Sequence, residues 1–241
     1  MNFKFLTVFL LFTHLGLLMK LASAQEWTQF RGTGTMGHSS DKNVPSKITE
    51  KEIKWALDLP GTGHSSPVVW GNSIFLTVSS KKAQGTRFVM ALSLDTGKEK
   101  WRNKQTHKIY RQHRFNDFSS STPCCDKDRV YVAWTSPDGV EAIALDHNGK
   151  EVWKKKLGKF YAKHGSSASP VLAGGSLVIG SHGEEGKSYV VGLNPENGVE
   201  RWRIDRDSND KGAFSTPVFR SADEILTHKG CLLYTSPSPR D

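Results

Sequence analysis

Histidines are the first side chains in this sequence that could do chemistry. His64 and His164 each stand just before a Ser-Ser pair that leads into a short apolar stretch. Imidazole rings bind ligands and metal ions, and their recurrence at equivalent positions favours a shared ligand site. Single histidines on separate segments lack the close spacing of a metal site, so turn-stabilising hydrogen bonds are the alternative role. We therefore predict no metal site.

A dense basic run follows Trp101 and includes two aromatic residues. Its basic members are Arg102, Lys104, His107, Lys108, Arg111, His113 and Arg114. We expect a long loop here, and long loops often carry recognition. The sequence therefore predicts Arg111, His113 and Arg114 as residues that bind an envelope protein or an anionic glycan, with a solvated loop as the alternative.

One glycine-rich segment has the spacing of a dinucleotide-binding loop. Residues 32–37 read Gly-Thr-Gly-Thr-Met-Gly, which is G-x-G-x-x-G. No hydrophobic strand precedes them and no helical pattern follows, so the βαβ context of such a loop is missing. Elsewhere the sequence has neither paired carboxylates with acid–base spacing nor a nucleophile motif. We predict a flexible entry segment at residues 25–54 and no catalytic residue.

The N-terminus has the pattern of an export signal. Lys4 is followed by an apolar run from Phe5 to Leu18 and then by Ala22-Ser23-Ala24, a small-x-small cleavage pattern. The apolar run is too short for a membrane span, and no later stretch is long enough. We expect residues 1–24 to be a signal peptide, the mature protein to be periplasmic or extracellular, and no transmembrane segment.

The C-terminus looks foreign to any domain. Residues 231–241 read Cys-Leu-Leu-Tyr-Thr-Ser-Pro-Ser-Pro-Arg-Asp, which resembles a translated sequencing adapter. We expect this segment to be an artefact, Cys231 not to be native, and the chain to be a fragment whose true C-terminus lies beyond residue 230.

Composition limits the class of protein. The 241 residues are 37% hydrophobic and 24% charged, which is typical of one large or two small globular domains. With 3 Cys, the chain cannot build the disulfide framework of a small secreted scaffold. The net charge of +9 comes from basic and acidic residues that are interspersed, and an exported protein rarely meets nucleic acid. We therefore expect no nucleic-acid partner.

The elements that position these residues repeat along the chain. Three segments share one pattern. Each begins with Ala or Gly, has Ser, Asp or Asn two residues later, and has a Gly four residues before a Trp. The structural pairs are Gly97 with Trp101, Gly149 with Trp153, and Gly198 with Trp202. A Gly beside Asn, Asp or Thr favours a tight turn with positive φ, which joins two strands and fixes their register. Each Trp is then placed to lie between neighbouring sheets.

A second element recurs in phase with the first. Ser66-Pro67, Thr122-Pro123, Ser169-Pro170 and Thr216-Pro217 each open a short strand, and a β-branched strand follows after a small turn. Each unit then has four antiparallel strands and a period of roughly 50 residues, typical of propeller blades. Trp55 supplies the closing strand of an earlier blade. The sequence predicts an all-β propeller of about three and a half blades over residues 55–230.

The motif Ala-x-Asp-x-x-Thr-Gly-x-x-x-Trp resembles the repeat of the pyrroloquinoline-quinone-like (PQQ-like) propellers, which BamB-like and quinoprotein-dehydrogenase propellers share. The start, Trp27-Thr-Gln-Phe-Arg-Gly32, resembles exported PQQ-like proteins of planctomycete type. The repeat departs from the family at Ser93 and at Asn194, where Asp is usual. The resemblance implies a complete ring of seven or eight blades and a binding or scaffolding module at the cell envelope. The alternative is the N-terminal part of a PQQ-dependent quinoprotein dehydrogenase.

The resemblance also defines what to expect of a cofactor. A vicinal disulfide lies against the quinone in quinoprotein alcohol dehydrogenases, which makes Cys124 and Cys125 candidates for cofactor binding. These two residues occupy a strand position, where a strained eight-membered ring would disrupt pairing, so small buried hydrophobes are the alternative role. The first strand of such blades is innermost, so His64 and His164 are candidates at one mouth of the channel. We predict no cofactor, with PQQ expected only under the dehydrogenase alternative.

Overall fold

The computed structural model describes residues 26–42, 44–80, 82–160, 164–183, 188–206, 214–221, 224–229 and 232–235. The predicted signal peptide lies outside these residues, as do Cys231 and residues 236–241. Residues 232–235 of the predicted adapter segment form a strand, and the origin of that segment stays a prediction. Within the described ranges, no helix is both long and apolar enough to cross a membrane.

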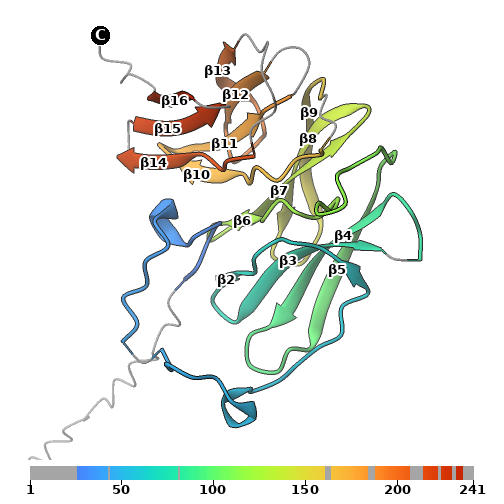
Figure 1. Cartoon of the computed structure of the whole chain (residues 1–241), viewed down its shortest axis with the longest axis vertical. Helices are drawn as coiled ribbons and strands as arrows, with labels where there is room; N and C mark the ends of the chain where they lie inside the picture. Colours follow the sequence, from blue (N-terminus) through green and yellow to red (C-terminus); the bar gives the residue numbers. More distant parts are fainter. Residues whose placement is uncertain are drawn as a thin grey trace, which may run out of the picture.

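Four antiparallel sheets are arranged like the blades of a fan (Figure 1). The first contains β1 (Gly61–Thr62), β2 (Val68–Trp70), β3 (Ser73–Ser80), β4 (Thr86–Ser93) and β5 (Glu99–Thr106). The second contains β6 (Cys124–Cys125), β7 (Arg129–Ser136), β8 (Gly139–Asp146) and β9 (Glu151–Gly158). The third contains β10 (Val171–Ala173), β11 (Ser176–Ser181), β12 (Ser188–Leu193) and β13 (Glu200–Arg206), and the fourth β14 (Val218–Ser221), β15 (Glu224–Lys229) and β16 (Leu232–Thr235).

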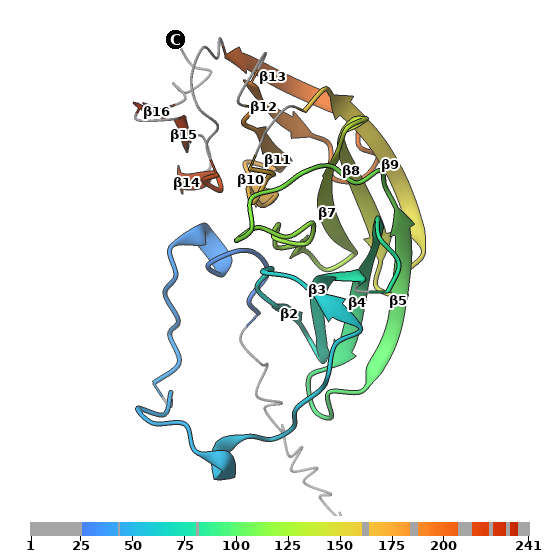
Figure 2. The ribbon, with the colours of Figure 1, turned by 45° about the vertical axis from the view of Figure 1, so that its right-hand side comes forward.

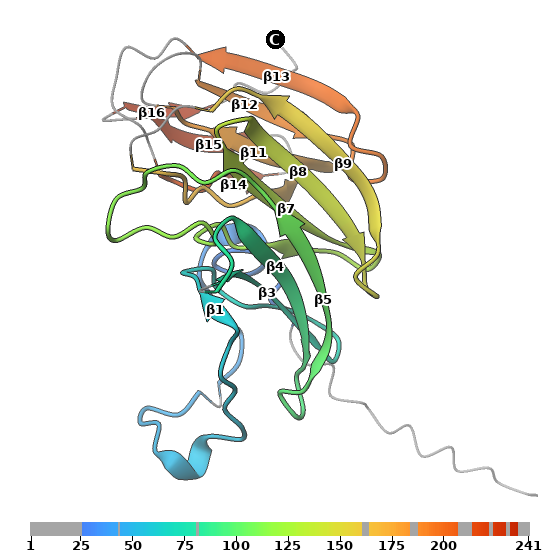
Figure 3. The same ribbon diagram turned by 90° about the vertical axis from the view of Figure 1, so that its right-hand side faces the viewer.

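This arrangement confirms the predicted all-β propeller and its incomplete ring. The four strands that open after a Pro are the inner strands β2, β6, β10 and β14, and each pairs with the strand that follows it. The Trp-bearing strands β5, β9 and β13 lie along the outer rim, as Figure 3 shows. Only two short 3-10 turns, η1 (Thr33–Thr35) and η2 (Glu50–Glu52), interrupt the strands and loops of the described chain.

The core lies between neighbouring sheets, because the central strands of each blade are buried on both faces. Along β7, Val130, Val132 and Trp134 pack toward the first blade, in a cluster with Val68 and Phe75. The alternate residues Tyr131 and Ala133 pack in a different cluster, toward the third blade, together with Leu177 and Ile179. Since successive side chains of a strand point to opposite faces, one strand joins two cores.

At the outer rim, Trp55, Trp101 and Trp153 each lie on the Gly turn of the blade that follows. The Trp101 Nε1–H donates to the carbonyl of His147 at 2.7 Å, and the ring lies directly against Gly149. Trp55 makes the equivalent bond to Leu94 (3.0 Å) over Gly97, and Trp153 makes it to Pro195 (2.9 Å) over Gly198. All three glycines have positive φ, between +69° and +82°. The Trp and Gly of the repeat therefore form one inter-blade contact, with Trp55 as the contribution of the preceding segment.

In each of the first three blades, the outer strand pair has a register shift opposite its Trp. The register of the outer pair shifts just after Ala91 opposite Trp101, after Ala144 opposite Trp153, and after Gly192 opposite Trp202. A bulge bends its strand and increases the local twist. The outer strand is therefore turned at its Trp in the same way in all three blades.

At the inner edge, the blades are connected by a second set of contacts, which are hydrogen bonds to the hydroxyl groups of the Ser/Thr-Pro motifs. The Ser66 N–H donates to Thr122 Oγ1 (2.9 Å), the Thr122 N–H to Ser169 Oγ (3.0 Å), and the Ser169 N–H to Thr216 Oγ1 (3.1 Å). Thr122 and Ser169 therefore each donate to the next blade and accept from the previous one, while Ser66 begins the series as a donor and Thr216 ends it as an acceptor. We refer to these four residues as the hydroxyl belt.

The entry segment runs across the inner edges of three blades. Trp27 pairs with Val69 of β2, and the Thr28 carbonyl accepts a hydrogen bond from the Cys125 N–H at 2.8 Å. The Gln29 side chain, which is only 3% exposed, accepts one from the Leu172 N–H at 2.9 Å. Beyond this crossing, the chain swings out in an extended path before it enters the first blade (Figure 2). The segment predicted as flexible is thus anchored at residues 27–29.

Replacing Gly149 with Ala tests the outer contact. The new Cβ would lie 2.6 Å from the Trp101 ring, and φ is +82° at this position. We expect Gly149→Ala to lower the free energy of unfolding by about 3 kcal/mol, from left-handed strain plus overpacking. Gly71→Ala is the matched control, because Gly71 also has positive φ (+52°) but nothing lies within 4 Å, so strain alone should cost about 1 kcal/mol. Urea denaturation of the intact protein measures both, and equal losses would contradict the packing role.

Thr122→Val tests the hydroxyl belt. Thr122 is 1% exposed, and the isosteric Val leaves the Ser66 N–H without its acceptor. We expect a loss of about 1 kcal/mol in the free energy of unfolding, because the part-buried Ser66 N–H loses its hydrogen bond. Thr122→Ser keeps the oxygen and should recover most of that loss. The belt would have no energetic role if Val and Ser behaved alike.

Candidate functional site

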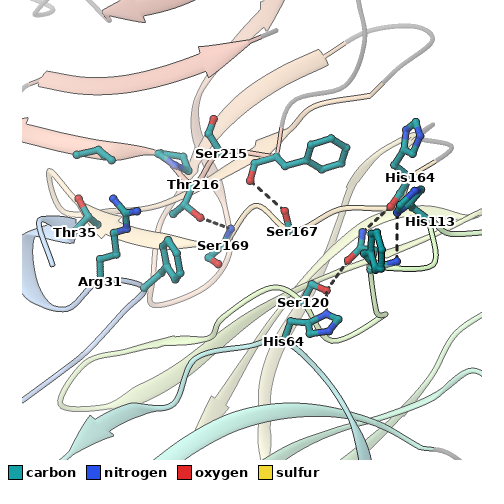
Figure 4. Close-up of a pocket in the computed structure, with 16 residues that line it drawn as sticks. Arg31, Thr35, His64, His113, Ser120, His164, Ser167, Ser169, Ser215 and Thr216 are labelled. Atoms are coloured by element: carbon teal, nitrogen blue, oxygen red, sulfur yellow. Dashed lines mark hydrogen bonds between the residues drawn. The ribbon is translucent and has the colours of Figure 1, made fainter. Parts of the chain in front are cut away.

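A pocket of about 700 Å³ lies where the inner edges of the blades meet the entry segment (Figure 4). The belt residues Ser169 and Thr216 form part of its wall, so the pocket is built on the inter-blade hydrogen bonds. The lining consists of Phe30, Arg31, Thr35, His64, His113, Phe115, Asn116, Ser120, His164, Ser167, Ser169, Phe214, Ser215, Thr216, Pro217 and Val218.

Three histidines from different segments meet in this pocket. The rings of His113 and His164 are 5.5 Å apart between centroids, and His64 Nδ1 lies 3.3 Å from Ser120 Oγ. Asn116 joins the two sides, since its Nδ2 donates to the His164 carbonyl (2.6 Å) and its Oδ1 accepts from Ser120 (2.5 Å). His64 and His164, predicted as candidates at the channel mouth, therefore line one pocket. Among the described residues, no group of three His, Cys, Asp or Glu is arranged to hold a metal ion.

The glycine-rich segment contributes two side chains to the same pocket through an unusual backbone. Arg31 (φ 62°) and Thr35 (φ 58°) are the non-glycine residues with positive φ in the described chain, and both line the pocket. Residues in such conformations persist only where their surroundings hold them, and they cluster at ligand sites. The G-x-G-x-x-G spacing thus marks a strained loop that faces the pocket and has no helix of the βαβ type behind it.

The pocket lining is aromatic and basic. Phe30, Phe115 and Phe214 supply aromatic surface, and the Arg31 guanidinium lies 5.7 Å from the centre of the Phe30 ring. The lining residues include one guanidinium and three imidazoles and no carboxylate. In Figure 4, Arg31 and Thr35 lie on one side and His113 and His164 on the other. The arrangement can hold a planar or extended anionic group.

The first part of the basic run is used within the fold. Arg102 and Lys104 lie on β5, which continues to Thr106, so the loop begins later than the sequence suggested. Arg102 pairs with Glu99 on the same strand. Two further members pair with the second blade: His107 Nε2 lies 3.1 Å from Glu141 and Lys108 Nζ 2.8 Å from Asp138. The hydrogen bond from His107 lowers the pKa of Glu141, and that from Lys108 lowers the pKa of Asp138.

The second part of the run stays at the pocket mouth. His113 lines the pocket, and Arg114 is stacked on the exposed Phe115 ring at 4.6 Å. Arg111 and Arg114 are exposed, and neither forms an ion pair with another residue that the structure describes. Of the three predicted partner-binding residues, the structure therefore brings His113 into the pocket, places Arg114 against the lining residue Phe115, and leaves Arg111 exposed on the same loop.

The adjacent cysteines lie away from the pocket. Cys124 and Cys125 form β6, are both free, and are 0% and 1% exposed. Their side chains enter two different cores, Cys124 toward the third blade and Cys125 toward the first. Burial is the main cause that raises the pKa of each thiol. Neither residue lines the pocket, so the structure does not bring them to His64 and His164.

Sequence reasoning assigned no site role to several residues of the pocket. Phe30 and Arg31 lie in the Trp27–Gly32 segment, which was used only for its family resemblance, and Phe214 lies two residues before the Thr of the fourth Ser/Thr-Pro motif. Their place in the repeat could have identified some of them. Residues that lead into each inner strand face the axis, and Phe214 occupies that position in the fourth blade. The contact between the entry segment and the fourth blade depends on the circular arrangement of the blades, so no local sequence pattern predicts it.

Comparison with known proteins agrees with this fold. Quinoprotein alcohol dehydrogenase PedH of Pseudomonas putida is 28% identical over 172 residues, which cover 65% of this chain and 26% of PedH. A europium-containing methanol dehydrogenase superposes with a TM-score of 0.58 at 16% identity, over 76% of this chain and 32% of its own. The quinohemoprotein alcohol dehydrogenase of Comamonas testosteroni superposes with a TM-score of 0.57 at 18% identity, over 86% and 36%.

These likenesses at low identity establish the fold alone, and this chain spans about a quarter to a third of the length of those relatives. A family model matches residues 52–227, which run from the entry segment into the fourth blade. The chain belongs to the family of the outer membrane protein assembly factor BamB, a family of PQQ-like repeat proteins.

Proposed function

We propose that this chain is part of an exported PQQ-like propeller that binds an anionic partner at the central pocket. The observation that carries the proposal is the lining itself, which combines Arg31 and three imidazoles with aromatic rings and contains no carboxylate. Arg31 places a positive charge in the lining, no carboxylate of the lining opposes it, and a cleft with such a field attracts anionic ligands. The occupant is an acidic segment of an envelope protein, whose carboxylates meet Arg31 while its apolar parts meet the phenylalanines.

The loop beside the pocket extends this surface. Arg111 and Arg114 are exposed, and Phe115 is 72% exposed although it is a large aromatic residue. Aromatic and Arg side chains are enriched at the centres of protein interfaces, and exposed aromatic surface beside them is typical of a binding site. The loop therefore supports a protein partner that is larger than the pocket.

The family supports the same class of function. The matching model describes an outer membrane protein assembly factor, and an assembly factor acts through other proteins. The signal-peptide pattern of residues 1–24 agrees with an envelope location. Because the chain spans only part of its relatives, the complete ring and its partners belong to this proposal.

Arg31→Gln tests the pocket as an anion site. The probe is fluorescein-labelled hexaglutamate, and its fluorescence anisotropy is measured with the intact protein at low salt. We expect Arg31→Gln to weaken binding about tenfold, because it removes a charged hydrogen-bond donor worth roughly 1.5–3 kcal/mol. Lys104→Gln is the charge-matched control, since Lys104 belongs to the same basic run but lies exposed on β5.

The control should change binding less than twofold, and binding should weaken as salt is added. Equal effects of the two substitutions would mean that hexaglutamate senses only net charge. No binding by the unaltered protein would remove the proposal of an acidic partner.

A quinoprotein dehydrogenase is the second candidate, favoured by the sequence likeness to PedH. PQQ is a planar tricarboxylate, so Arg31 and the imidazoles suit its anionic edge. The described lining lacks the carboxylate oxygens that a calcium ion beside it would require, and Cys124 and Cys125 are not part of the lining. The residues of this chain therefore fit the quinone only in part, and we derive no catalytic step through it.

Thiol titration separates the two candidates. Burial raises the pKa of Cys124 and Cys125, so both thiols should stay protonated and unreactive at pH 8. In intact Cys231→Ser protein purified without reductant, we expect both to react with Ellman's reagent only after denaturation. If denatured protein shows no free thiol until it is reduced, the pair is a disulfide, and dye-linked alcohol oxidation with added PQQ and calcium then becomes the deciding measurement.

A further inference from the structure

The central pocket contains side chains whose charge depends on pH. His64, His113 and His164 come from three different segments, and each is an exposed residue that lines the pocket. Because they are exposed, the three rings can exchange protons with solvent and can contact a ligand in the pocket. They differ in this respect from His107, whose side chain is only 8% exposed and is paired with Glu141.

The positive charge of the lining changes over the physiological pH range. An imidazole gains or loses its charge between about pH 5 and 8, whereas a guanidinium stays charged. When the imidazoles are neutral, Arg31 is the single charged group of the described lining, and each proton taken up adds one positive charge. The described lining contains no carboxylate that would offset these charges. The attraction of the pocket for an anion should therefore increase as the pH falls.

Hydrogen bonds within the fold occupy one nitrogen of two of these rings. His113 Nδ1 accepts from the Phe115 N–H at 3.3 Å, and His64 Nδ1 lies 3.3 Å from Ser120 Oγ. Since the Ser120 hydroxyl donates to Asn116 Oδ1, His64 is the donor to Ser120, and Nε2 is the nitrogen of His64 that takes up a proton. Neither Nε2 atom is hydrogen-bonded to another residue that the structure describes. A turn-stabilising role therefore accounts for the Nδ1 atoms and leaves Nε2 of both rings for a ligand.

His113 and His164 are close enough to influence each other's protonation. Their ring centroids are 5.5 Å apart, and the Phe214 ring lies edge-on to His164 at 6.4 Å. Two positive charges at this separation repel, so a second proton enters the pair less readily than the first. An anion beside both rings offsets the repulsion and favours the doubly charged form. Binding of an anion and uptake of protons are therefore linked, and each promotes the other.

The other charged groups around these rings are mostly positive. On the described elements that form the pocket, they are Arg31 on the opposite side (Figure 4) and, on the loop that carries His113, the residues Arg111, Arg114 and Asp117. The Asp117 carboxylate is hydrogen-bonded to Thr62 and Ser119 and does not line the pocket. The fourth blade contributes only uncharged side chains to the lining, from residues 214–218. The charge in the pocket is therefore set by Arg31 and by the protonation of the imidazoles.

We propose, on the basis of the acidic partner inferred above, that protonation of His64, His113 and His164 regulates the central pocket. The pocket holds its acidic partner at mildly acidic pH and releases it as the pH rises. Arg31 supplies the charge that is present throughout this range, and the imidazoles supply the charge that varies. Protons taken up on binding return to solvent when the partner leaves.

The test measures binding of tetramethylrhodamine-labelled hexaaspartate to the intact protein by fluorescence anisotropy at pH 8, 7 and 6 and constant ionic strength. The aspartate carboxylates stay ionised over this range, because their ordinary pKa is about 3.9. We expect the Kd to fall about tenfold from pH 8 to pH 6, which corresponds to a net uptake of roughly one proton. His38→Asn is the control, because His38 is exposed on the entry segment and does not line the pocket, and it should keep the tenfold ratio.

Replacing His64, His113 and His164 together with Asn should reduce the ratio between the two Kd values to less than twofold. Asn keeps a polar atom close to the position of Nδ1 but does not take up a proton. Thermal melts show whether this variant is folded, and His113→Asn alone, which should lower the ratio in part, replaces it if it is not. Calorimetry of the unaltered protein at pH 7, in buffers of different ionisation enthalpy, independently measures the protons taken up on binding.

The possible failures of the regulation and of the acidic partner can be told apart. Binding that depends on Arg31 but has the same Kd at pH 6 and pH 8 would overturn the regulation and leave the acidic partner in place. A tenfold ratio that persists in the Asn variants, or binding without proton uptake, would assign the pH effect to the overall charge of the protein and would also overturn it. Absence of hexaaspartate binding at every pH would remove the acidic partner and the regulation together.

Discussion

The contact between a Trp on one blade and a Gly turn on the next is the constraint on which this structure depends. The ring of Trp101 occupies the space where any side chain at residue 149 would have to lie, and its N–H satisfies a carbonyl of the same turn. The turn therefore has to be glycine both for its positive φ and for the room it leaves. At Trp101 and Trp153 a register shift in the outer strand pair coincides with this contact, so the strand is bent in the same way at both.

The inner edge is held by different chemistry, and the pocket depends on it. The hydroxyl belt joins the blades through amide–hydroxyl bonds at their inner edges. The residues just before each belt position, such as His64 and His164, are then directed toward a common space. Architecture and site are thus coupled, since the residues that fix the blades also form a wall of the pocket.

Periodic features could be predicted from the sequence, and long-range ones could not. The Gly–Trp spacing and the Ser/Thr-Pro positions repeat in phase, so they predicted the blades and their inner strands. The start of the basic loop was misplaced, because nothing local to Lys104 marks the continuation of β5. The role of Arg31 was also missed, because it depends on the entry segment meeting the fourth blade.

The crossing at residues 27–29 sets an order of events during folding. The bond between Gln29 and Leu172 joins residues 143 positions apart, whereas each blade is made from contacts within a short stretch of chain. Local contacts form sooner than distant ones because loop closure has an entropic cost. The bonds of Trp27 and Thr28 can therefore form once the first and second blades are in place, whereas Gln29 has to wait for the third blade before it joins all three at the axis.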